Sequence, residues 1–256
     1  MKTLLIEQFT CRQDNFGVLV HDPMTGDTAA IDAPDAAAIE NHLAQSEWKL
    51  THLLITHHHP DHVEGIPALK EKCGPLVIGP EPEASKISGL DETYGDGDHF
   101  TFAGRRVDVI HTPGHTLGHV CYHIAEEKLL FAADTLFALG CGRLFEGTPK
   151  DMWTSLQKLM ALPDDTTIYC GHEYTLANAR FAMSVDPNNA ALAERFERIT
   201  EMRDKGIATL PTAMGYEKRT NPFLRPDDPK IRAHLGMKDA SDEEVFAELR
   251  RRKDNF

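Results

Sequence analysis

The sequence predicts an α/β fold in which helices cover sheet layers, followed by a second domain built of helices. Short apolar runs of strand length alternate with helical segments up to about residue 173. Beyond that point, helical periodicity replaces the strand pattern. We therefore expect one domain over residues 1–173 and a second over residues 174–256. No Gly/Ser-rich linker separates them, so we expect them to dock tightly.

In the first domain the signals run in the order strands, helix, strand, helix, strands, helix, strand. The strands are expected at residues 3–32 (a meander), 50–56, 76–79, 99–102, 105–110, 119–124, 128–133 and 166–170. The helices are expected from Asp35 to Gln45, beyond Glu64, and from Thr148 to Leu162, the last with a capping box. Residues 80–98 have a loop composition. In the second domain, helices are expected at 174–185, 188–204 and 242–253, the last opened by a capping box at Ser241.

Composition disfavours several classes of partner. The chain has 256 residues and a net charge of −13, which disfavours nucleic acid and anionic membranes. The cysteines, five in number, are scattered and form no C-x-x-C, as is typical of a reducing compartment. The N-terminal residues lack the pattern of a signal peptide, and no apolar run is long enough to span a membrane. We expect a cytoplasmic monomer.

Polar groups suited to metal binding follow several of the apolar runs. They are His57, His59, Asp61, His62, His115, Asp134 and His172. Each alone would be assigned to a capped loop or a buried core histidine, but their recurrence at strand ends favours a metal site. His58 alternates out of phase with its neighbours, so we assign it to the opposite side. Cys141 and Cys170 lie near the site in sequence, and we expect them to be buried free thiols.

Five imidazoles and two carboxylates are too many for one tetrahedral zinc, but they suffice for two ions that share a ligand. Asp134 suits the bridging role, because it ends an apolar strand where an unpaired charge would be costly. Metal ions at such a site generate hydroxide near neutral pH. We expect two divalent ions per chain, with zinc first and iron or manganese as alternatives, since no soft ligand is required.

The motif His57-His58-His59-Pro60-Asp61-His62, followed by Gly114-His115, Asp134 and Gly171-His172, resembles the signature of the metallo-β-lactamase superfamily. This resemblance implies an αββα sandwich with a dinuclear site at one edge. It further implies two ligand sets that share Asp134: His57, His59 and His115 for the first metal, and Asp61, His62 and His172 for the second.

A narrower resemblance covers nearly the whole chain. Four segments are similar to the glyoxalase II family, the hydroxyacylglutathione hydrolases: Gly140–Thr148, Gly171–Thr175, Thr220–Arg225 and Arg250–Lys253. The resemblance implies that Arg143, Tyr174, Arg250 and Lys253 bind the glutathione part of the substrate. Phe145 departs from the Tyr that many members carry and removes one hydroxyl from that pocket. A protein of net charge −13 needs such a local basic patch to hold an anionic thioester.

The implied reaction is hydrolysis of S-(2-hydroxyacyl)glutathione thioesters such as S-D-lactoylglutathione, the second step of methylglyoxal detoxification. A metal-bridging hydroxide would attack the carbonyl carbon, with Asp61 and Asp134 as the catalytic carboxylates. The main alternative is a glutathione persulfide dioxygenase that uses a single iron. A lactonase and a β-lactamase are further alternatives, but neither explains the basic helical end. A non-catalytic metal-binding protein is disfavoured because all seven ligand positions are intact.

Overall fold

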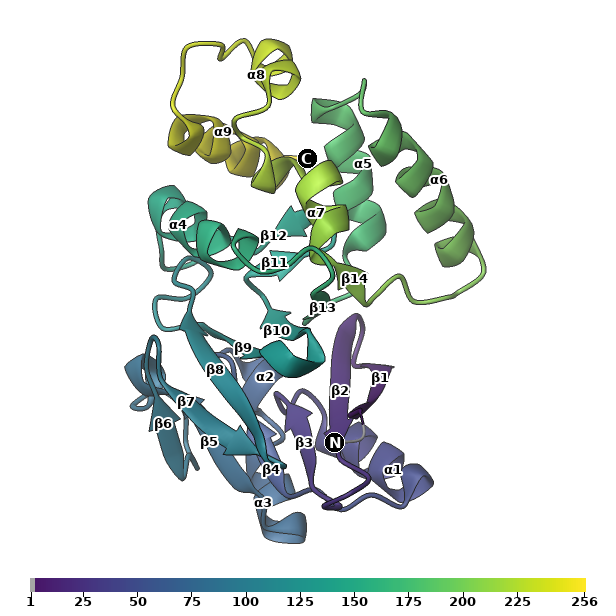
Figure 1. Ribbon diagram of the computed structural model, residues 1–256, viewed down its shortest axis with the longest axis vertical. Helices are drawn as coiled ribbons and strands as arrows, with labels where there is room; N and C mark the ends of the chain where they lie inside the picture. Colours follow the sequence, from purple (N-terminus) through teal and green to yellow (C-terminus); the bar gives the residue numbers. More distant parts are fainter. Residues whose placement is uncertain (1–2) are drawn as a thin grey trace. The chain divides into compact units, whose positions relative to one another are not determined.

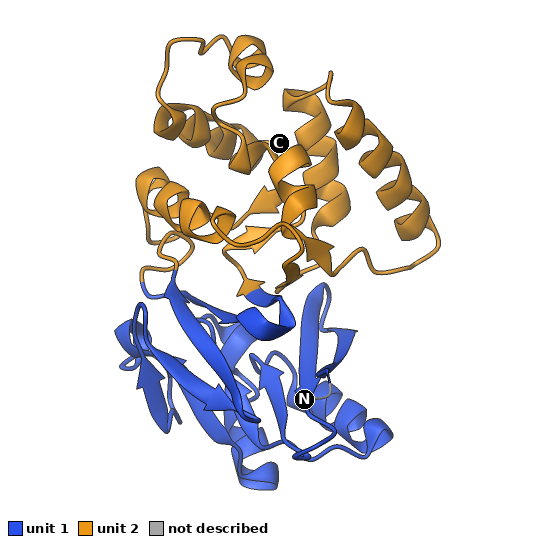
Figure 2. Cartoon of the chain, in the orientation of Figure 1, with its two compact units in different colours: residues 1–111, 118–131 blue, residues 112–117, 132–256 orange. Residues whose placement is uncertain are grey.

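The computed structural model describes residues 3–256, which form two compact units. Unit 1 runs through His111 and includes Gly118–Phe131, whereas unit 2 consists of Thr112–Leu117 and Ala132–Phe256 (Figure 2). The boundary expected at residue 173 falls inside unit 2. It stays a prediction, because one compact unit can contain parts of two domains.

The first sheet of unit 1 carries the histidine motif at one edge. Its six strands lie in sequence order: β1 (Leu5–Cys11), β2 (Asn15–His21), β3 (Thr28–Ile31), β4 (His52–Leu54), β5 (Leu76–Pro80) and β6 (Glu92–Tyr94). Strands β1 to β3 pair antiparallel, and β3 to β6 pair parallel. In the parallel part Leu54 lies between Ile31 and Ile78, so the carboxyl ends of β3, β4 and β5 meet at one edge.

Helices α1 (Ala36–Ser46) and α3 (Ile66–Cys73) cover one face of this sheet. The side chain of Asp35 caps α1 by accepting a hydrogen bond from the Ala38 amide, as the sequence predicts. Both helices contribute to one apolar core with the sheet: Phe9, Cys11, Leu19, Ala30, Ala33, Ile39, Leu43, Leu50, Leu53, Ile55, Ile66, Leu69, Val77 and Ile87. Burial of these apolar side chains stabilises the packing of the two helices on the sheet.

A second layer of strands covers the other face of the first sheet. It contains β7 (His99–Phe102), β8 (Arg105–His111), β9 (Val120–Ile124) and the start of β10 (Leu129–Ala133), paired antiparallel in that order. The hydroxyl of Tyr122 on β9 donates to the Ile55 carbonyl at 2.6 Å, and Phe102 packs edge-on against His52. In unit 1 the first sheet therefore lies between a layer of helices and a second layer of strands (Figure 1).

Unit 2 combines short strands with most of the helices. The strands are β11 (Leu136–Phe137), β12 (Gly140–Cys141), β13 (Thr167–Cys170) and β14 (Thr212–Ala213). The helices are α4 (Pro149–Met160), α5 (Thr175–Val185), α6 (Ala190–Asp204), α7 (Met214–Thr220), α8 (Pro229–Leu235) and α9 (Asp242–Asp254). The capping boxes predicted for α4 and α9 are both confirmed.

Some short elements differ from the sequence-based expectation. Residues 80–98, expected as a loop, contain the 3₁₀ turn η1 (Glu81–Glu83) and strand β6. The expectation that no strand follows His172 is wrong, because β14 pairs with β13 through Thr212 and Ile168. A two-residue strand carries no readable alternation, which explains the omission. Among the described residues, no helix has both the length and the apolar character needed to cross a membrane.

Candidate metal centre

The histidine motif leaves β4 in an extended conformation and ends in the short helix α2 (Pro60–Val63). His57 is fully buried, and its Nε2 lies 3.1 Å from Nδ1 of His59. Two nitrogens bound to one tetrahedral zinc at the usual bond lengths are about 3.3 Å apart. The separation of these two ring nitrogens therefore suits chelation of one ion.

A buried carboxylate, Asp32, orients this motif from the end of the neighbouring strand β3. It accepts hydrogen bonds from the amide and hydroxyl of Thr56 at 2.7 and 2.9 Å, and from His62 Nδ1 at 2.8 Å. The Thr56 hydroxyl in turn lies 3.0 Å from His57 Nδ1. Because the Nδ1 atoms of His57 and His62 are held in this way, their Nε2 atoms are the ones presented for metal binding.

Asp61 is also held by a neighbour within unit 1. Its Oδ2 accepts a hydrogen bond from Asn15 Nδ2 at 3.0 Å and lies 3.6 Å from His62 Nε2. The second distance is long for a charge-assisted hydrogen bond but suits two ligands of one ion. Asn15, the first residue of β2, therefore fixes the rotamer of a predicted ligand.

His58 points to a different partner from its neighbours, as its phase in the motif predicts. Its amide and its Nδ1 lie 2.6 and 2.9 Å from Oε2 of the buried Glu83. The other oxygen of Glu83 accepts the Gly118 amide at 3.1 Å. Glu83 thus ties the histidine motif to the start of the Gly118–Phe131 segment.

In unit 2, a single carboxylate oxygen lies between two predicted histidine ligands. Asp134 follows β10, and its Oδ2 is 3.4 Å from Nε2 of His115 and 3.4 Å from Nε2 of His172. All three side chains are buried. Charge-assisted hydrogen bonds are usually about 2.7–2.9 Å long. Both of these oxygen–nitrogen distances are longer, and they suit a carboxylate oxygen and an imidazole nitrogen that bind the same ion. The donor set of unit 2 therefore fits a bridging carboxylate.

His115 is oriented by the loop that follows β12. Its Nδ1 donates to the carbonyl of Arg143 at 2.9 Å, which leaves Nε2 facing Asp134. The adjacent Gly142 packs so tightly that a Cβ there would lie 2.0 Å from the Asp134 carbonyl oxygen. Only glycine fits, because backbone cannot yield as a flexible side chain can. The Gly-Cys-Gly segment thus positions two predicted ligands.

Buried polar side chains of α7 and its C-terminal end hold the hairpin that carries this segment. Nδ2 of Asn221 donates to the Gly140 and Phe137 carbonyls at 3.0 and 3.2 Å. Glu217 accepts the Leu139 amide at 2.8 Å. Because buried amide and carboxylate groups are costly without partners, these contacts specify one arrangement of the hairpin.

Three of the four residues predicted to bind substrate gather around Asp254, at the end of α9. Arg250 is buried and donates to Asp254 Oδ1 at 2.7 Å and to the Cys141 carbonyl at 2.9 Å. Arg143 has two thirds of its side chain in solvent, with Nε 4.0 Å from the same Oδ1. Lys253 donates to the Ala177 carbonyl at 3.2 Å. Burial, followed by the charges of Arg250 and Arg143, lowers the pKa of Lys253 to about 8.

The fourth residue, Tyr174, stacks on a predicted ligand. Its ring lies parallel to that of His172 at 4.8 Å between centroids. The exposed ring of Phe145 stands edge-on to His115 at 5.3 Å. Aromatic side chains thus border both histidines that face Asp134, and the absence of a hydroxyl on Phe145 leaves that side apolar.

The two cysteines of this region are buried free thiols, as expected. Burial raises the pKa of Cys141 to about 11 and that of Cys170 well above its usual value. A thiol held protonated is a poor metal ligand. This favours a site of nitrogen and oxygen donors.

Sequence reasoning missed the residues that orient the ligands. Asp32 carried a usable signal, since it ends an apolar strand just as Asp134 does. Asn15 and Glu83 carried none, because their roles depend on contacts over 46 and 25 residues of sequence.

Comparison with known proteins places this fold and these motifs in a family. Residues 17–172 match the metallo-beta-lactamase superfamily, and residues 173–256 match the hydroxyacylglutathione hydrolase C-terminus. The crystal structure of ETHE1 from Myxococcus xanthus is similar, with a TM-score of 0.69 and 24% identity over 96% of this chain and 90% of that one. At that identity, the likeness concerns the fold alone. The chain thus has the α/β sandwich of the metallo-β-lactamase superfamily with a helical C-terminal part, and its His/Asp clusters indicate divalent-metal binding.

Relatives identify the branch of the superfamily. The hydroxyacylglutathione hydrolase of Rhizobium meliloti (strain 1021) is 64% identical over 256 residues, all of both chains. That of Rhizobium etli is 60% identical over the same full length. The chain belongs to the hydroxyacylglutathione hydrolase family, also called glyoxalase II, whose members are thioester hydrolases.

Proposed function

We propose that this protein hydrolyses S-(2-hydroxyacyl)glutathione thioesters, with S-D-lactoylglutathione as substrate and D-lactate and glutathione as products. Identity over the full length of curated hydroxyacylglutathione hydrolases supports this activity. The observation that carries the chemistry is the position of Asp134 Oδ2, at 3.4 Å from both His115 and His172. A carboxylate in that position suits a dinuclear hydrolytic site.

Two divalent ions, zinc in the first place and iron or manganese otherwise, are the cofactors in this proposal. One ion would be held by His57, His59 and His115, and the other by Asp61, His62 and His172. Asp134 would be a ligand of both ions. The ring-nitrogen distance of 3.1 Å between His57 and His59 supports the first set, and buried Cys141 and Cys170 argue against thiolate ligation. Such ions supply acidified water and polarise the thioester carbonyl.

The chain's own residues would prepare this chemistry by fixing its geometry. Asp32 and Thr56 set which nitrogen His57 and His62 present. Asn15 holds Asp61, the carboxylate that we propose orients the nucleophilic water. A thiolate is a good leaving group, so the reaction makes no strong demand for a general acid.

Glutathione would bind beside α9. Arg143 is the exposed cation of the predicted set, and Lys253 lies near enough to it for the two charges to interact. We propose that these two hold glutathione carboxylates, that Tyr174 packs against the thioester end, and that Arg250 acts mainly by fixing Cys141 and Asp254. Carboxylates favour such cationic partners because charged hydrogen bonds are the stronger kind.

Domain organisation, compartment and assembly belong to the same proposal. The meeting of the two family matches at residues 172 and 173 supports a catalytic domain of residues 1–173 and a helical domain of residues 174–256. The five free cysteines support a reducing compartment such as the cytoplasm. The monomeric state stays a prediction, which sedimentation would test.

Product analysis tests the proposed activity against its main alternative. The metal-loaded protein should release glutathione from S-D-lactoylglutathione without oxygen uptake, and should leave glutathione persulfide unchanged. Oxygen consumption with the persulfide, and no thioester turnover, would instead identify a dioxygenase.

A further inference from the structure

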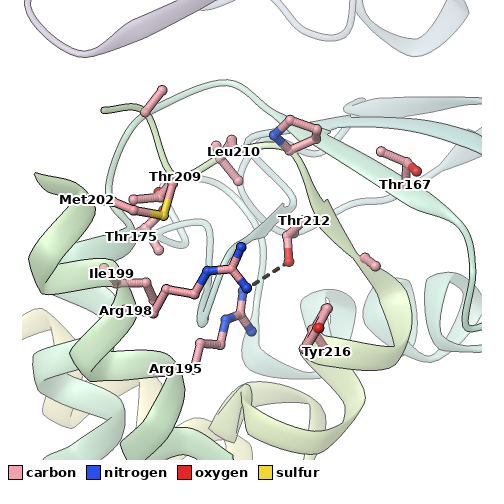
Figure 3. A pocket seen from close by; sticks show the side chains of 13 residues that line it. Thr167, Thr175, Arg195, Arg198, Ile199, Met202, Thr209, Leu210, Thr212 and Tyr216 are labelled. Carbon is pink, nitrogen blue, oxygen red and sulfur yellow. Dashed lines mark hydrogen bonds between the residues drawn. The ribbon is translucent and has the colours of Figure 1, made fainter. Parts of the chain in front are cut away.

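Unit 2 contains a cavity that uses none of the predicted metal or substrate residues. Its volume is about 400 Å³, and it lies between the start of α5, helix α6, the loop before β14 and the start of α7. Pockets of a few hundred cubic ångströms are typical of small-molecule sites. Two arginines, several threonines and a group of apolar side chains line it (Figure 3).

The two arginines of the cavity differ in their partners. Arg195 is committed to the protein: it pairs with the buried Glu217 and donates to Thr212 at 2.9 Å. Arg198 extends from the same helix toward the cavity, but its guanidinium makes no hydrogen bond or ion pair with any other residue in the described range 3–256 (Figure 3). It therefore offers donors in the fork geometry that suits a carboxylate.

Acidic groups beside the cavity do not cancel this charge. Glu217 is matched by Arg195. Glu173, whose carboxylate accepts the amide and hydroxyl of the lining residue Thr209, is matched by Arg203 at 3.6 Å. Arg198 remains as the unbalanced cation of the lining, which favours an anionic ligand.

Thr175 supplies an independent indication of a ligand. Its side chain is 2% exposed and lines the cavity, and its Oγ1 has no hydrogen-bond partner within the part of the chain that the structure describes. Buried hydroxyls are almost always hydrogen-bonded, because an unsatisfied one is costly. A polar ligand atom in the cavity would satisfy this group.

The remaining wall is apolar. Ile199, Met202, Leu210 and Pro211 line the cavity, so a small inorganic anion would leave this surface without contacts. We propose that the cavity binds a small organic carboxylate whose anionic head meets Arg198 and Thr175 and whose short apolar chain packs on this wall.

Hexanoate is a suitable probe, with hexylammonium as the charge-reversed control. Binding would be measured by calorimetry on the full-length, metal-loaded protein. The wild type should bind hexanoate and not hexylammonium. Arg198→Gln should weaken binding about tenfold or more, the usual effect of losing one charge-assisted hydrogen bond. Thr175→Val should weaken it several-fold, and Thr175→Ser should restore it.

Arg180→Gln is the matched control, because Arg180 is an exposed arginine of α5 that does not line the cavity. Its affinity for hexanoate should equal that of the wild type. Equal binding by Arg198→Gln and the wild type would overturn the proposal. So would binding that persists in Arg198→Gln and disappears on metal chelation, because the carboxylate would then occupy the metal centre.

Discussion

Arg143 and Arg250 both approach the carboxylate of Asp254, but their surroundings differ. Arg250 has 5% of its side chain exposed and three protein acceptors close to its guanidinium: Asp254 Oδ1, the Cys141 carbonyl and the Cys141 sulfur. Arg143 is 66% exposed, and its Nε lies 4.0 Å from Asp254 Oδ1. At the residue scale, Arg143 is therefore the cation with donors available for a ligand.

Replacing Arg143 with alanine should lower kcat/KM for S-D-lactoylglutathione about tenfold to a hundredfold, the range for one charge-assisted bond. Metal content should not change, since it is the backbone carbonyl of Arg143 that contacts His115. Salt should weaken the wild type more than the variant. Arg251→Ala is the control, because Arg251 is an exposed arginine paired with Glu248. An equal loss of kcat/KM in both variants would show that Arg143 is an ordinary surface residue with no role in substrate binding.

If Lys253 binds glutathione as proposed, substrate affinity should depend on pH. Its pKa is lowered to about 8, first by burial and then by Arg250 and Arg143. KM for the anionic thioester should therefore rise as pH increases through about 8, because the ammonium loses its charge. The same shift makes unfolding less favourable as pH rises from about 8 to the ordinary value of 10.5, since there the unfolded chain binds the extra proton.

Lys253→Arg separates this effect from other titrations. Arginine stays charged over the whole range, so KM of the variant should remain flat where that of the wild type rises. The measurement is KM from neutral to alkaline pH at constant metal content. A rise of equal size in both proteins would assign the titration to another group.

At the scale of elements, alternation and caps were enough to predict the long pieces of the fold. The caps at Asp35, Thr148 and Ser241 lie where the sequence puts them, because they depend on contacts within one helical turn. The helix α7 and the strand β14 were not predicted, because both are short and contact distant segments: Glu217 of α7 accepts the Leu139 amide, 78 residues away, and Thr212 of β14 pairs with Ile168. The helix α8 was missed although it carries local signals, with the Asp228 cap, Pro229 at its start and Gly236 at its end.

The β11–β12 hairpin offers the sharpest test of an element's role. Gly142→Ala would put a methyl group against the carbonyl of Asp134 and close to His115. We expect lower metal content and hydrolysis, because two ligands must move apart, with the helical content unchanged. Metal analysis and circular dichroism would measure this. Gly95→Ala is a control for glycine replacement, since Gly95 has no positive φ and the nearest atom to its added Cβ is the flexible end of the Glu81 side chain. A variant at Gly142 with full metal content would contradict the positioning role.

At the scale of the whole molecule, the predicted ligands are divided between the two units. His57, His59, Asp61 and His62 belong to unit 1, whereas His115, Asp134 and His172 belong to unit 2. The sequence indicates all seven because each follows or lies beside an apolar run, and they stay predicted ligands. It could not predict Asn15 and Glu83 as orienting groups, because only folding brings them to the motif, whereas Asp32 carried a signal at the end of its apolar strand.

Metal titration tests whether Asp134 bridges two ions in a dinuclear centre. Metal-free protein would be titrated with zinc while bound metal and S-D-lactoylglutathione hydrolysis are measured together. In the wild type, activity should reach its maximum at two ions per chain. Asp134→Ala should hold no more than one ion and be inactive, with its fold checked by circular dichroism. Full activity of the wild type with one ion, or of Asp134→Ala with two, would contradict the account.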